Sequence, residues 1–180
     1  MALTATIYTF DIQLSDVDRN VYETLAIRAA CQPSETAEHL ITRVLAYCLE
    51  YREGIAFSRG IAEADTPAVF VKDLTGTLLT WIDIGAPDAA RLHKASKAAA
   101  RVAVYTHRDA DRLVEQLSGQ KIHRAAAIEV HGFDRDMLAS IVEHLDRRNA
   151  WTISVTEGHL YVTIGADTIE GDVTRYALSA

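Results

Sequence analysis

The sequence predicts an α/β (α+β) fold, in which a central mixed sheet is flanked by helices and β-hairpins occur near both ends of the chain. Three observations predict it. Segments with the apolar patterns of strands recur along the chain, helical patterns lie between them, and no repeat, low-complexity tract or linker interrupts the order. The length of 180 residues suits a single domain spanning residues 1–180.

The first hairpin is predicted near the N-terminus. Residues Ala5–Leu14 alternate between apolar and polar side chains, which indicates a half-buried strand. The turn cluster Ser15–Asn20 follows, and we interpret Val21–Ala30 as a second strand that pairs back on the first. A helix is the rival interpretation for this last segment, because its leucine and alanine residues suit a helix equally well.

A helix is predicted over Glu35–Arg52, where apolar residues recur at helical spacing. Ser34 is expected to cap its first turn, in which acidic side chains are favourable. On a helical wheel Glu38 falls at the edge of the apolar stripe and Glu35 on the outer face. Glu38 is therefore the acid that we expect to reach the sheet.

The next segments form the predicted core of the sheet. Ile55–Gly60 is expected to be its first strand, and it contains Arg59, a candidate partner for a phosphate or a carboxylate. Ala68–Lys72 and Leu78–Ile84 are rich in β-branched and large apolar residues, and the turn Asp73–Gly76 between them indicates a hairpin.

A helix over Asp88–Ala100 follows this hairpin, with Pro87 and Asp88 suited to its first turn and many alanines after them. Arg101–Thr106 has the pattern of a buried strand. The later elements are predicted as a helix over Asp109–Leu117, a strand over Ala125–His131, a helix from Asp134 or Asp136 to Arg147, a hairpin of Trp151–Thr156 with His159–Ile164, and an edge segment over Asp172–Ala177.

Composition narrows the classes of function. The net charge of −7 argues against a protein whose surface as a whole holds nucleic acid by electrostatic attraction. The chain shows neither a signal peptide nor a membrane-spanning run, and its two cysteines form no CxxC pair, so we expect a cytoplasmic protein without a role at the membrane. No zinc, dinucleotide, P-loop or hydrolase motif is present.

Two acids bracket the predicted hairpin. Asp65 precedes its first strand and Asp83 lies near the end of its second. Because the start of one antiparallel strand lies beside the end of its partner, both carboxylates are expected at one end of the sheet. Hard oxygen ligands favour Mg²⁺ or Mn²⁺, so this pair predicts a metal site.

Helix, hairpin, helix and strand, with an acid before the second core strand and another at the end of the third, resemble the PD-(D/E)XK nuclease-like superfamily. The segments MALTATIY, PSETAEHL, FSRG and WIDIGAPDAARLHKA are similar to one branch of it, the YaeQ family of bacterial proteins. The resemblance implies a metal-dependent nuclease acting on phosphodiester bonds of nucleic acid. Asp65 and Asp83 would be its metal ligands, and Glu38 would complete the site.

The lysine of the superfamily motif is replaced here by Gly85. Lys94, one turn inside the next helix and at the edge of its buried face, is the expected substitute, and Arg91 within that face is the alternative. The competing hypothesis is a catalytically inactive binding or regulatory module, for which the resemblance implies a transcription-related role. In that case Asp65, Asp83 and Lys94 would form a structural cluster. We expect a monomer under either hypothesis.

Overall fold

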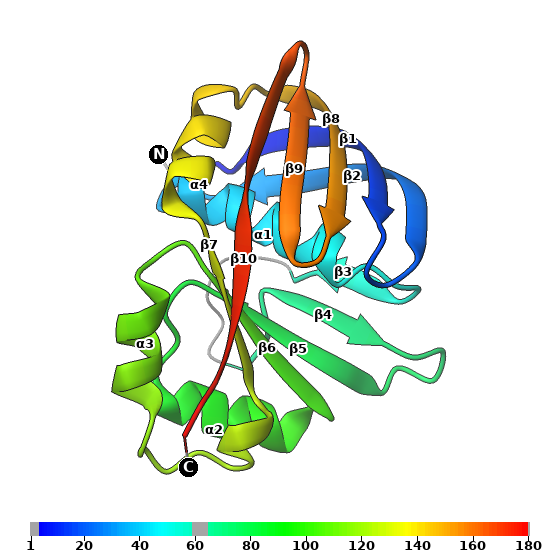
Figure 1. Ribbon diagram of the computed structural model, residues 1–180. Coiled ribbons are helices and arrows are strands. Elements are labelled where there is room, and N and C mark those ends of the chain that lie inside the picture. Colours follow the sequence, from blue (N-terminus) through cyan, green and yellow to red (C-terminus); the bar gives the residue numbers. More distant parts are fainter. Residues whose placement is uncertain (1–3, 59–64, 180) are drawn as a thin grey trace.

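The computed structural model describes residues 4–58 and 65–179. The strands of this part of the chain form one sheet in the order β2-β1-β8-β9-β10-β7-β6-β5-β4-β3 (Figure 1). Their bounds are Thr6–Asp16 (β1), Val21–Cys31 (β2), Ile55–Phe57 (β3), Val69–Lys72 (β4), Leu78–Ile84 (β5), Arg101–Thr106 (β6), Glu129–Phe133 (β7), Arg148–Thr156 (β8), His159–Ile164 (β9) and Asp167–Ala177 (β10). The helices are Ala37–Leu49 (α1), Ala89–Ala98 (α2), Ala110–Leu117 (α3) and Arg135–Glu143 (α4), with a short 3-10 turn at Ala125–Ala127.

The predicted mixed sheet is confirmed. β1 runs parallel to β8, and β6 runs parallel to both β5 and β7, whereas the remaining neighbours are antiparallel. The N-terminal hairpin is also confirmed, because β2 pairs with β1 along its whole length and is not a helix. The predicted hairpin near the C-terminus is formed by β8 and β9.

Strand β10 joins the two halves of the sheet (Figure 1). Its first part, Asp167–Asp172, pairs with β9, and its second part, Val173–Ala177, pairs with β7. Of the described strands, only β7 pairs with Val173–Ala177, so the predicted edge segment over Asp172–Ala177 is confirmed. The strand begins earlier than predicted, at Asp167, and most of its side chains are exposed.

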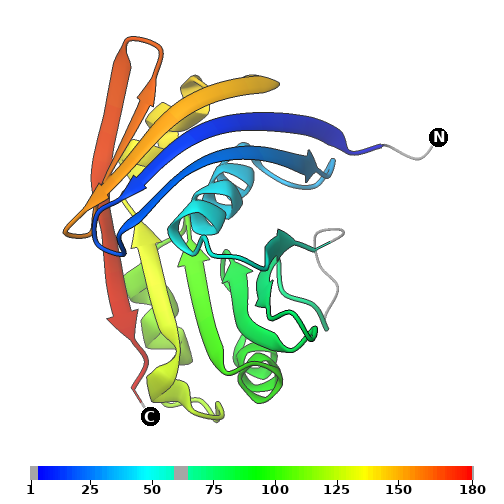
Figure 2. The same ribbon diagram turned by 90° about the vertical axis from the view of Figure 1, so that its right-hand side faces the viewer.

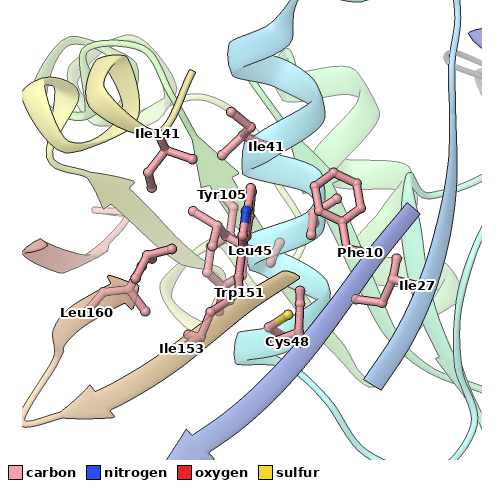
Figure 3. Close-up of a cluster of buried hydrophobic side chains, with 14 of the residues drawn as sticks. Phe10, Ile27, Ile41, Leu45, Cys48, Tyr105, Ile141, Trp151, Ile153 and Leu160 are labelled. Carbon is pink, nitrogen blue, oxygen red and sulfur yellow. The ribbon is translucent and has the colours of Figure 1, made fainter. Parts of the chain in front are cut away.

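Helix α1 lies between the two halves of the sheet. Figure 2 shows the blue strands β1 and β2 on one side of the cyan helix and the green strands β5 and β6 on the other. Leu40, Ile41, Val44 and Leu45 are fully buried there, in one cluster with Trp151 of β8 and Tyr105 of β6, which belong to different halves of the sheet (Figure 3). Burial of a large apolar side chain contributes about 1.5–3 kcal/mol, so this helix anchors both halves to each other.

Strands β3, β4, β5, β6 and β7 form the lower half-sheet in Figure 1. Helix α2 covers the face of this half-sheet that points away from α1. Leu92 and Ala95 are fully buried and pack in one cluster with Trp81 of β5 and Val102 of β6. Ile82, the next residue along β5, belongs instead to the cluster around α1. The predicted packing of Asp88–Ala100 on the sheet is thus confirmed, and neighbouring residues of β5 face different helices.

Some boundaries differ from the prediction. Helix α1 begins at Ala37, and the side chain that caps it is Thr36, which accepts a hydrogen bond from the His39 amide; Ser34 precedes this turn. The predicted strand Ala125–His131 begins with the 3-10 turn, since Arg124 before it adopts a positive φ.

The predicted helix to Arg147 ends earlier, at Glu143. Beyond it Asn149, only 6% exposed, bonds both the amide and the carbonyl of Asp146 and so fixes a turn before β8. In the described part of the chain, no helix has both the length and the apolar character needed to cross a membrane.

Candidate functional site

Asp83 lies near the end of β5 and is 2% exposed. Both of its carboxylate oxygens accept hydrogen bonds from Arg91, Oδ2 from Nε at 2.8 Å and Oδ1 from Nη2 at 2.9 Å. The guanidinium also lies 5.5 Å from the ring centroid of Trp81. This two-pronged, charge-assisted contact is the strongest form of pairing between an arginine and a carboxylate.

The start of α2 positions Arg91 for this contact. Asp88 caps the helix by accepting a hydrogen bond from the Arg91 amide at 2.8 Å. Gly85, just after β5, has a φ of +95°, a conformation that glycine adopts readily and that turns the chain from the strand toward the helix. Arg91 therefore lies in the first turn of α2 and reaches back over the end of β5.

Asp65 lies just before β4, at the same end of the sheet. It is exposed and forms an ion pair with Lys94 of α2, whose side chain is also largely exposed. The carbonyl of the next residue, Thr66, accepts a hydrogen bond from Arg91 Nη2 at 2.8 Å. The structure thus brings the two acids of the sequence hypothesis to one helix, but pairs each of them with a different cation.

This arrangement does not fit the predicted metal site. Both Asp83 oxygens already bond Arg91, so an ion would have to displace the half-buried guanidinium before it reached the buried carboxylate. The described residues contain no group of three or more histidine, cysteine, aspartate or glutamate side chains placed to hold one ion. The side chains present are those of a paired electrostatic cluster.

Glu38, the third predicted ligand, lies on the other side of the sheet. It is exposed in the first turn of α1, the helix that packs on the Ile82 face of β5, whereas Asp83 points toward α2. Glu38 instead lines two cavities of about 480 and 710 Å³ together with His107 and Arg135. Burial, assisted by the charges of His39 and Arg108, lowers the pKa of His107 to about 4.

Glu35 is the buried acid of α1's N-terminal region, and the sequence analysis missed it. Its side chain is completely buried just before the helix, although the wheel placed it on the outer face. Arg43 donates to Glu35 Oε1 from Nη2 and to Oε2 from Nε, both at 3.0 Å, and His39 Nδ1 lies 2.5 Å from Oε2. His39 and Arg43, four residues apart, lie on one side of α1, and Glu35 reaches them from outside the helix, before the capping Thr36, where helical spacing gives no signal.

These contacts determine the charge of Glu35. Burial by itself raises the pKa of its carboxyl group, but the hydrogen bond with His39 and the charge of Arg43 outweigh burial and hold the pKa below its ordinary value. The side chain is therefore an ionised, buried carboxylate at neutral pH.

A cavity of about 510 Å³ lies beside this cluster. It is bordered by the end of β2, the start of α1, and the residues that follow β3 and precede β4. Its polar lining residues are Arg28, Gln32, Glu35, His39, Arg43 and Ser58. Arg59, the predicted phosphate partner, lies outside the described residues.

Comparison with known proteins places the chain in a family. The sequence model of the family described as "YaeQ protein" matches residues 1–173. The chain belongs to the YaeQ family. It is 29% identical to the "Uncharacterized protein YaeQ" of Escherichia coli K12 over 177 residues, 98% of each chain, and equally similar to that of Salmonella typhi.

Solved YaeQ structures have the same fold. The crystal structure of the YaeQ protein from Pseudomonas syringae superimposes with a TM-score of 0.86 at 29% identity, covering 96% of both chains. That from Xanthomonas axonopodis pv. citri gives a TM-score of 0.86 at 25% identity, covering 97% of this chain and 99% of the other. The family resemblance expected from the four sequence segments is confirmed.

Proposed function

We propose that this chain is a binding or regulatory module, built on a sheet related to PD-(D/E)XK nucleases, in which the acids at α2 are structural. The superfamily part of this proposal is supported by the succession α1, β3, β4, β5, α2 and β6. The two-pronged bond between Arg91 and the buried Asp83 carries the structural part. A carboxylate held in this way stabilises the packing of α2 on β5 and is not poised to bind an ion.

A second candidate is the metal-dependent nuclease that the sequence suggested, with Mg²⁺ or Mn²⁺ and nucleic acid as ligands. One observation favours it. Arg91 of α2 donates hydrogen bonds to the Asp83 carboxylate and to the carbonyl of Thr66, the residue after Asp65, so Asp83 and the backbone next to Asp65 contact the same side chain. In that function Arg91 would have to leave Asp83, and Lys94 would have to leave Asp65, before an ion could bind.

One experiment distinguishes the two. Calorimetric titration with Mg²⁺ and Mn²⁺, and incubation with single- and double-stranded DNA and RNA, are performed on the wild-type protein, Asp83→Asn and Asp65→Asn. The structural proposal expects no metal-dependent cleavage from any of the three. It also expects Asp83→Asn to lower the free energy of unfolding by about 1–3 kcal/mol, since the half-buried Arg91 guanidinium loses its counter-charge.

Asp65→Asn is the matched control. The same change of one charge at the exposed pair with Lys94 should cost less than about 1 kcal/mol. Cleavage by the wild-type protein that requires metal and disappears in both variants would overturn the structural proposal and establish the nuclease.

A further inference from the structure

The cavity beside Glu35 lies where the two edges of the sheet approach the same helix. β2 and β3 are the terminal strands of the sheet order, and residues at the end of β2 and at the end of β3 both line it. Its volume of about 510 Å³ falls within the range of about 300–1,000 Å³ that is usual for small-molecule sites.

The charge of the lining differs from that of the whole chain. The protein carries a net charge of −7, yet the ionisable residues that line this cavity in the described part of the chain are two arginines, one histidine and a single acid. The acid, Glu35, is already neutralised by Arg43, which leaves the positive charge of Arg28 uncompensated among the described lining residues. An anion entering the cavity would therefore be attracted.

The cationic wall is held rigidly. The side chain of Arg43 is 9% exposed, its Nη2 donates to the Ala30 carbonyl at 2.8 Å, and its guanidinium lies 5.1 Å from the ring centroid of Phe57. His39 is held through Nδ1 by Glu35. Groups that are fixed before a ligand arrives lose little conformational entropy when it binds.

Ala29, Ala30, Phe57 and Ala68 supply the apolar part of the lining, and Gln32 and Ser58 add neutral polar groups. A cavity whose wall combines placed polar groups with apolar surface suits a small organic molecule better than a bare inorganic ion.

We propose that this cavity binds a small organic anion. Its phosphate or carboxylate group is held by Arg28, in the field of Arg43 and His39, and its apolar part lies against Phe57 and the alanines. The buried Glu35 acts as a positioning residue that fixes Arg43 and His39. This inference rests on the proposed binding function and names the class of ligand.

The test uses phenyl phosphate and benzoate as probes, at constant ionic strength, with binding followed by calorimetry and by amide shifts in NMR spectra. We expect at least one probe to bind and to shift the amides of Arg28, Gln32 and His39. Comparison of the two probes distinguishes a phosphate site from a carboxylate site. Arg28→Gln should weaken binding roughly tenfold, as expected for the loss of one charge-assisted hydrogen bond.

Arg52→Gln is the control, because Arg52 is an exposed arginine beyond the other end of α1 and does not line this cavity. It should change affinity by less than about twofold. Equal weakening by both variants, shifts confined to other surfaces, or no binding of either probe at about 10 mM would overturn the inference. None of these results bears on metal-dependent cleavage, so the proposed function succeeds or fails separately.

Discussion

The two faces of the lower half-sheet each carry a buried carboxylate held by an arginine, and the surroundings of the two pairs differ. On the α2 face, Asp83 is joined to Arg91, whose guanidinium lies against Trp81 and bonds the Thr66 carbonyl. On the α1 face, Glu35 is joined to Arg43 and also to His39, and these three residues line a cavity.

The difference shows which pair has room for a ligand. The Asp83 pair connects a strand to the helix that covers it, and its partners are protein groups. In the Glu35 cluster, by contrast, a completely buried carboxylate holds Arg43 and His39 in place at the wall of a cavity. Buried ion pairs contribute little net stability in either place, so the contrast between the two rests on the open space beside the Glu35 cluster, for which we propose a ligand.

The largest expected effect concerns Arg43. Arg43→Met leaves the fully buried side chain of Glu35 with His39 as its one remaining ion-pair partner among the described residues. Removing one member of a buried ion pair costs about 3–5 kcal/mol, so urea unfolding should show a loss of that order. Arg112→Met, at an exposed position on α3, should change stability by less than about 0.5 kcal/mol.

A loss for Arg43→Met no greater than that of the control would show that Glu35 is not an uncompensated charge in the variant. Protonation of the carboxyl group, or entry of water into the cavity, would then have replaced the arginine. The contrast between the two faces would lose its energetic basis.

The sequence predicted the strands of the lower half-sheet because most of their residues are apolar, as in Leu78–Ile84, where Thr80 and Asp83 are the two polar residues. It also singled out Arg91 and Lys94, since the helical spacing of α2 is regular. Glu35 was misplaced because the wheel assumed a helix that already included it, whereas the helix starts after Thr36. The edge segment Asp172–Ala177 was predicted, but the earlier part of β10 from Asp167 was not, because hydrogen bonding of its backbone leaves no trace in a polar sequence.

The next effect distinguishes the two cations of α2. Arg91→Met should lower the free energy of unfolding by about 2–3 kcal/mol, because it leaves the buried Asp83 carboxylate without its donor. Lys94→Met, three residues along the same helix, disturbs an ion pair between exposed side chains and should cost less than about 1 kcal/mol. Urea unfolding of both variants measures the contrast, and equal losses would contradict the assignment of Asp83–Arg91 as the structural pair.

The smallest effect is a dependence of stability on pH at His107, beside the first turn of α1. Its ring centroid lies 5.8 Å from that of His39, and burial together with the charges of His39 and Arg108 lowers its pKa from 6.5 to about 4. In the unfolded chain His107 takes up a proton near pH 6.5, whereas the folded protein resists protonation until the pH nears 4. The stability that His107 contributes is therefore complete above pH 6.5 and is lost as the pH falls from 6.5 toward 4.

Replacement His107→Gln removes this titration and should flatten the pH dependence. When the pH is lowered from about 7 to about 5, the free energy of unfolding of the wild-type protein should fall by on the order of 1 kcal/mol more than that of the variant. This figure allows for solvent screening of the partly exposed ring. Urea unfolding of both proteins at the two pH values isolates the contribution, because the other histidines are common to both. A variant that loses as much stability as the wild-type protein would show that His107 is protonated as easily in the folded protein as in the unfolded chain. The α1 face would then be more open to solvent than the buried Glu35 cluster implies.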